Sequence, residues 1–133
     1  MMQGYMIWLV IAAGGAIGAM ARHAVGQLAM RLLGPNFPWG TLTVNVLGSL
    51  AMGLVIAWLV AREPAGQGVR AFLAVGLLGA FTTFSTFALD AVTLYERKAM
   101  MTAGLYVGAS VILSIVALFA GLAAGRSLFE RAL

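Results

Sequence analysis

The sequence predicts an all-α integral membrane protein with four transmembrane helices in a single domain, residues 1–133. Of the 133 residues, 62% are hydrophobic and only 9% are charged. That is more apolar surface than a water-soluble domain of this size could bury in its core. The apolar residues form four segments of about 20 residues or more, each long enough to cross a bilayer as a helix. Short connections rich in Gly, Pro and charged residues separate these segments.

Composition also excludes several classes of protein. The formal charge of +4 comes from eight basic residues against four acids, and these lie mainly at the ends of the spans. No basic run or stacking motif is present, so nucleic acid is not an expected partner. The chain has no cysteine, which excludes disulfides and thiolate metal sites. A cleavable signal peptide is not expected, because the N-terminus lacks a basic leader.

The first span, residues 5–33, carries small residues at helical spacing. Gly14 and Gly18 are four residues apart, which predicts a bare helix face that another helix can approach closely. Arg22 follows while the segment is still apolar, and its predicted role is structural: reaching the interface or capping carbonyls. His23 is the only histidine and is interpreted as an interfacial residue, since one imidazole does not make a metal site.

The second span, residues 39–61, follows a Gly- and Pro-containing turn at 34–38. Thr41, Asn45 and Ser49 are spaced by four and therefore share one helix face. An amide in hydrocarbon is costly unless it has a partner. Asn45 is expected either to join helices or to donate to a passing solute, and the sequence alone does not choose between these roles.

The third span, residues 69–94, holds the most unusual stretch of the chain. Four hydroxyls, those of Thr82, Thr83, Ser85 and Thr86, occupy five consecutive positions inside an apolar segment. Such groups can bond back to helix carbonyls, but four together indicate a broken helix with a polar site near mid-membrane. Gly76 and Gly79, just ahead, weaken the helix there. Asp90, further along, is the only acid near a hydrophobic interior.

The fourth span, residues 99–124, carries a polar stripe. Its members are again four residues apart: Thr102, Tyr106, Ser110 and Ser114. The stripe can bond to neighbouring helices, and it also suits a track for a partly dehydrated ion.

The charges give no orientation in the membrane. With four spans, one side holds four basic residues and the other three, or four if Arg22 is included. These are Arg62, Arg70, Arg126 and Arg131 against Arg31, Arg97 and Lys98. The positive-inside rule therefore predicts no orientation. Either so few charges balance by chance, or the chain inserts both ways and pairs as an antiparallel dimer.

The polar groups within the spans are neutral donors, which suits an anion better than a cation or a proton relay. Phe84 and Phe87 fit the same interpretation, because an aromatic ring is electropositive at its edge, but on this evidence alone ordinary core packing explains them better. No nucleotide-binding loop, metal cluster or catalytic constellation is recognisable. The sequence therefore argues against an enzyme or a primary pump.

Three motifs together resemble the small bacterial fluoride channels of the Fluc or CrcB family. They are Gly14-Gly15 with Gly18-Ala19 and Arg22, then Trp39-Gly40-Thr41-Leu42 with Val44-Asn45 and Gly48, then Gly79 with Thr82-Thr83-Phe84-Ser85-Thr86-Phe87. The resemblance covers the whole chain, and the last string is highly specific. It implies a dual-topology homodimer in the bacterial inner membrane, surrounded by lipid, with two antiparallel pores for passive fluoride efflux.

The resemblance also implies roles for individual residues. The carbonyls of Gly79 and Thr82 from both subunits would hold a structural Na⁺ at the centre of the dimer. Asn45 would donate to fluoride, and Phe84 and Phe87 would form an aromatic box. Further hydroxyls along the path would come from Thr41, Ser85, Thr86, Tyr106, Ser110 and Ser114. Arg22 would be structural or vestibular, and Asp90 stands where family members often carry Glu.

Two other functions compete with a channel. A small multidrug-type exporter also has four spans and dual topology, but it needs a carboxylate in its first span, and residues 5–33 contain no Asp or Glu. A non-transporting scaffold subunit would explain the glycine faces but would leave the hydroxyl tracks without a purpose.

Overall fold

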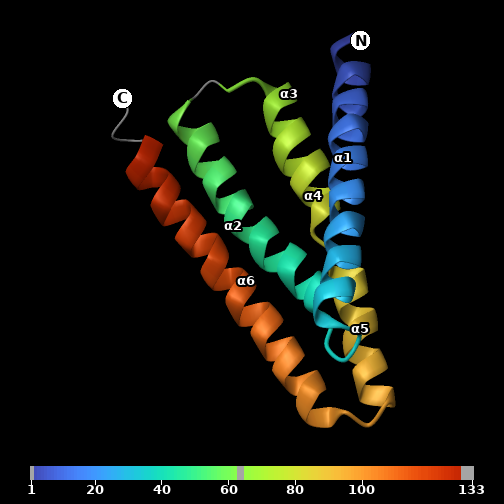
Figure 1. The fold of residues 1–133 in the computed structure, drawn as a ribbon. Helices are drawn as coiled ribbons and strands as arrows, with labels where there is room; N and C mark the ends of the chain where they lie inside the picture. Colours follow the sequence, from blue (N-terminus) through green and yellow to red (C-terminus); the bar gives the residue numbers. More distant parts are fainter. Residues whose placement is uncertain (1, 63–64, 130–133) are drawn as a thin grey trace.

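The computed structural model describes residues 2–62 and 65–129, and every regular element in these ranges is helical (Figure 1). Four helical stretches are long and apolar enough to cross a membrane: Gly4–Leu33, Trp39–Ala61, Gln67–Glu96 and Met100–Phe129. This confirms the predicted all-α fold with four spans. The elements in chain order are α1 (Met2–Leu33), α2 (Trp39–Ala61), α3 (Gln67–Arg70), η1 (Ala71–Leu78), α4 (Gly79–Phe81), α5 (Phe84–Glu96) and α6 (Met100–Phe129).

The third span is a composite of four elements. α3 continues into η1, a π-helical segment, and then into α4. Thr82 then adopts ψ 158° and Thr83 adopts φ −153° and ψ 123°, so two consecutive residues have extended backbone before α5 resumes the helix. This geometry is compatible with the predicted break, and we call Thr82 and Thr83 the break. π-helical segments are rare and concentrate at functional sites.

Glycines bring two pairs of helices into backbone contact. On α1, a Cβ added to Gly14 would lie 2.5 Å from the carbonyl oxygen of Phe72, and one added to Gly18 would overlap that of Leu77. Gly53 on α2 and Gly121 on α6 meet in the same way. The close approach predicted for the first span is therefore made against η1 and α4. Two backbone-to-backbone seams, α1 with the third span and α2 with α6, hold the protomer together.

The outer surface is apolar. Large side chains such as Trp8, Leu9 and Phe119 are each about two-thirds exposed or more, as expected where lipid rather than water surrounds a protein. The start of α1, the end of α2 and the end of α6 lie at one end of the bundle, and the α1–α2 and α5–α6 turns lie toward the other (Figure 1).

Candidate functional site

A groove of about 400 Å³ runs beside the extended backbone of the third span. We call it the central groove. It gathers side chains from α2, α5 and α6 together with the residues of the break, and it includes five of the predicted path residues: Asn45, Phe84, Phe87, Ser110 and Ser114. Its remaining lining is Gly48, Ser49, Met52, Thr82, Thr83, Val111, Ile115 and Leu118.

Asn45 connects α2 to the break through two hydrogen bonds to Thr83. Its Nδ2 donates to the Thr83 carbonyl at 2.9 Å, and its Oδ1 accepts from the Thr83 N–H at 2.8 Å. An extended residue has no helical partner for either backbone group, so the amide satisfies both. The helix-joining role is thus present in the structure. A primary amide carries two N–H donors, and the second remains for another acceptor in the central groove.

Thr83 also begins α5. Its hydroxyl oxygen accepts from the Thr86 N–H at 3.2 Å, the N-cap arrangement that stabilises the first turn of a helix. The same hydroxyl donates to the Thr86 hydroxyl at 3.1 Å and lies 3.4 Å from that of Ser85. Thr82 instead bonds back to the Leu78 carbonyl at 3.0 Å. The hydroxyl string therefore builds the break, and only Thr82 uses the helix-internal bond.

Arg22 reaches across from α1 to the other side of the break. Its Nε donates to the Ala80 carbonyl at 3.0 Å, and the side chain is half-buried. Helices end in carbonyls without partners and a partial negative charge, and a cation there stabilises both. The sequence indicated carbonyl capping as one role for Arg22, and the structure identifies Ala80 as the acceptor.

Replacing Arg22 by Gln is expected to lower the free energy of unfolding by about 1.5–3 kcal/mol, the range for a hydrogen bond involving a charged group. Arg31→Gln is the matched control, because Arg31 is exposed in the last turn of α1. Thermal unfolding of the purified proteins in the same detergent compares the two. Equal stability of the two variants would show that the bond to Ala80 contributes nothing.

The break also frees a carbonyl. In a continuous helix, Gly79 would accept from the Thr83 N–H, but that N–H donates to Asn45. The freed Gly79 oxygen is a hard ligand of the kind that Na⁺ accepts, so the chemistry of the predicted sodium site fits. Among the described residues, no cluster of three or more His, Cys, Asp or Glu side chains offers an alternative metal site.

A row of aromatic rings leads away from the central groove. Phe84 and Phe87 are 5.4 Å apart between ring centroids, and Phe87 and Tyr106 are again 5.4 Å apart. Tyr106 is fully buried, and its hydroxyl donates to Asp90 Oδ2 at 3.0 Å. One turn further along α6, the buried Ser110 hydroxyl has no hydrogen-bond partner among the described residues. A buried polar atom of this kind calls for a partner from outside the chain.

Most of the remaining predicted residues line two further pockets. Asp90 and Thr41 line the outer pocket, of about 330 Å³, together with Thr93, Arg97 and the α1–α2 loop. Arg22, His23, Thr41 and Thr86 line a third pocket of about 310 Å³. Ser85 is exposed beside Thr83. The structure thus divides most of the predicted site residues among three pockets, while Gly79, Ser85 and Tyr106 line none of them.

Sequence reasoning missed Phe37. It lies in the α1–α2 loop, which the sequence marks only as a turn, yet its ring packs on Tyr106 at 5.5 Å and on Trp39 at 4.6 Å between centroids. A large aromatic residue next to proline in a loop expected at the membrane surface was the available signal.

A known protein family and several known proteins are similar to this chain. The model of the family described as CrcB-like protein, Camphor Resistance (CrcB), matches residues 9–122, which is most of the chain. The chain belongs to the CrcB family. Several relatives are similar to this chain over nearly their whole length. A protein of Agrobacterium fabrum named "Fluoride-specific ion channel FluC" is 53% identical over 120 residues, covering 90% of this chain and 96% of the relative.

Two further CrcB relatives carry the same name. The protein of Rhizobium etli is 54% identical over 121 residues, covering 90% of this chain and 96% of its own. That of Hyphomonas neptunium is 51% identical over 123 residues, covering 92% and 97%. The three relatives thus match 90–92% of this chain.

Proposed function

We propose that this protein is a fluoride-selective ion channel through which fluoride leaves the cell passively. The carrying observation is the central groove, whose lining holds no charged side chain and includes the buried Ser110 hydroxyl, which has no partner in the described chain. The names of its CrcB relatives support fluoride as the ion. These relatives are channels, and the protein is accordingly a transport protein and not an enzyme.

The donor set explains the choice of ion. Fluoride is small and strongly hydrated, so a path through the membrane must replace its water with several good donors at short range. Asn45, Ser110 and the start of α5 supply such donors, and the helix N-terminus adds partial positive charge. Chloride is larger and more weakly hydrated, and it gains less from a tight set of donors.

The protein acts as an antiparallel homodimer in the bacterial inner membrane. Phe84 is 78% exposed in the protomer although it lines the central groove, and a second copy placed over this ring would close the path. The even distribution of charge permits the two copies to insert in opposite directions. Two paths then run side by side, each completed by an aromatic ring of the other subunit.

A structural Na⁺ joins the two subunits. The Gly79 and Thr82 carbonyls would hold it, one pair from each protomer, and Arg22 would keep the neighbouring Ala80 carbonyl occupied. The ion supplies a fixed positive charge at the break and a link across the dimer. The yield of cross-linked dimer should therefore be higher when Na⁺ is the only monovalent cation present than when a large organic cation replaces it.

The direct test is ion efflux from liposomes that contain the purified protein. Fluoride is expected to leave rapidly, chloride to stay, and the fluoride rate to be the same with and without a proton gradient. A rate that requires the proton gradient would favour a coupled exporter instead. Intact dimers that release neither ion would favour a scaffold subunit and would contradict the channel.

A further inference from the structure

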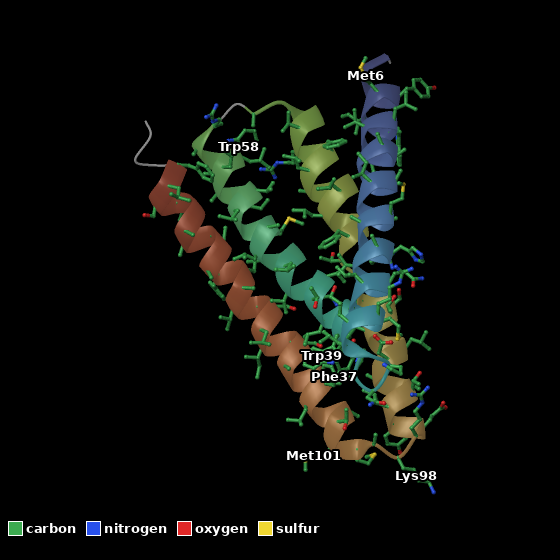
Figure 2. All side chains as sticks on the ribbon, viewed as in Figure 1. Met6, Phe37, Trp39, Trp58, Lys98 and Met101 are labelled. Carbon is green, nitrogen blue, oxygen red and sulfur yellow. The ribbon has the colours of Figure 1, made fainter. Side chains whose placement is uncertain are left out.

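The row of rings beside the ion path does not end at Tyr106. Phe37 meets Tyr106 edge-to-face, with ring planes at 87°, and Trp39 packs against Phe37 with its ring plane tilted by 49°. Figure 2 shows Phe37 and Trp39 side by side where α2 begins, next to α6. Phe37 also packs against the small buried cluster of Phe87, Leu94 and Tyr106. A residue of the α1–α2 loop therefore completes the packing around a residue of the path.

The loop holds Phe37 in place. Gly34 has φ +78°, which lets the chain turn sharply after α1, and its N–H bonds to the Met30 carbonyl at 3.1 Å. The Phe37 carbonyl accepts from the Trp39 N–H at 2.8 Å. Pro35 and Pro38 flank the ring and restrict the backbone on both sides. The backbone of the loop therefore restricts the position of Phe37.

Tyr106 lies between two open regions. Its ring contacts Phe87, which lines the central groove, while its hydroxyl bonds to Asp90, which lines the outer pocket. Phe37 lines the outer pocket too and covers Tyr106 on that side. Tyr106 itself is completely buried and lines neither cavity, while its neighbours Phe87 and Asp90 line one each.

We propose that Phe37 is a positioning residue for ion conduction: it fixes the Tyr106 ring so that the phenol hydroxyl stays on Asp90 between the central groove and the outer pocket. The inference rests on the proposed fluoride channel. Without the Phe37 ring, Tyr106 gains the empty volume beside it and swings away from Asp90, so the hydrogen bond between these two side chains beside the path is lost.

A double-mutant cycle tests this coupling. Phe37→Ala and Tyr106→Phe are each expected to slow fluoride efflux by about tenfold, and the double variant is expected to be no slower than the slower single variant, because both remove the same hydrogen bond. Phe37→Tyr keeps the ring beside the roomy outer pocket and should restore the wild-type rate. Phe119→Ala is the control for loss of a ring, since Phe119 lies exposed on α6.

Additive slowing in the double variant would overturn the inference, and so would a wild-type rate in Phe37→Ala. If Phe37→Ala does not assemble, Phe37→Leu keeps most of the apolar volume and is expected to show the same non-additivity with Tyr106→Phe. Absence of fluoride efflux from the wild-type protein would instead contradict the proposed function itself. A conducting wild-type protein with an additive cycle contradicts only the role of Phe37.

Discussion

Replacing Asn45 by Ala is expected to slow fluoride efflux by about 30- to 100-fold. The side chain makes two hydrogen bonds to the Thr83 backbone, and each is worth roughly 1–1.5 kcal/mol, more than a factor of five in a population. Without them, the extended backbone of the third span has no partner for its N–H and carbonyl. The break then samples other conformations, and a donor to the ion is lost at the same time.

A second amide provides the matched control. Gln67 is exposed at the start of α3 and lines none of the three pockets, and Gln67→Ala is expected to conduct like the wild type in the same fluoride-electrode assay. Asn45→Asp separates the two roles of the amide, because aspartate keeps an acceptor for the Thr83 N–H but removes both donors. It is expected to conduct poorly as well. An Asn45→Ala channel of normal rate would show that the break is held by other contacts.

Replacing Gly18 by Ala is expected to destabilise the protomer by about 3 kcal/mol, the upper end of the usual range for overpacking. The new methyl group would overlap the Leu77 carbonyl oxygen, with the Phe81 nitrogen 3.1 Å away. Backbone atoms cannot rotate aside as a flexible side chain can. α1 must therefore move away from the third span, which also pulls Arg22 from Ala80.

Gly15→Ala is the control on the same helix, because a Cβ on Gly15 meets nothing within 4 Å in the protomer. The yield of monodisperse protein and its unfolding temperature in detergent should fall for Gly18→Ala and stay unchanged for Gly15→Ala. A stable Gly18→Ala protein would mean that the seam yields more easily than its geometry indicates. Loss of both proteins would reveal a contact of Gly15 outside the protomer.

Much of this architecture could be predicted from the sequence because each signal is local. Hydropathy marks the four spans, and the hydroxyl string with Gly79 indicates where the third span is interrupted. The small residues at Gly14 and Gly18 predict a close helix contact without naming the partner. These features depend on residues a few positions apart, where spacing translates directly into a helix face.

The partners of the key polar groups could not be predicted in this way. Asn45 meets Thr83, 38 residues away, and Arg22 meets Ala80, 58 residues away. Such pairs depend on how the helices pack, which periodicity does not specify. The π-helical register of η1 could not be predicted either, because nothing in an apolar stretch of Ala, Phe, Leu, Val and Gly distinguishes it from an α-helix. Phe37 was missed because its target lies on another helix.

The glycine seams have a mechanical consequence. Where Gly14, Gly18 and Gly121 touch their neighbours, peptide groups rest on peptide groups, and no side chain lies between them that could change rotamer. Peptide planes are the stiffest parts of a polypeptide. α2 and α6, which meet at one of these seams, also line the central groove, so rigid backbone contact fixes the spacing of these two walls. The proposed selection of fluoride over the larger chloride requires a groove whose width changes little with thermal motion.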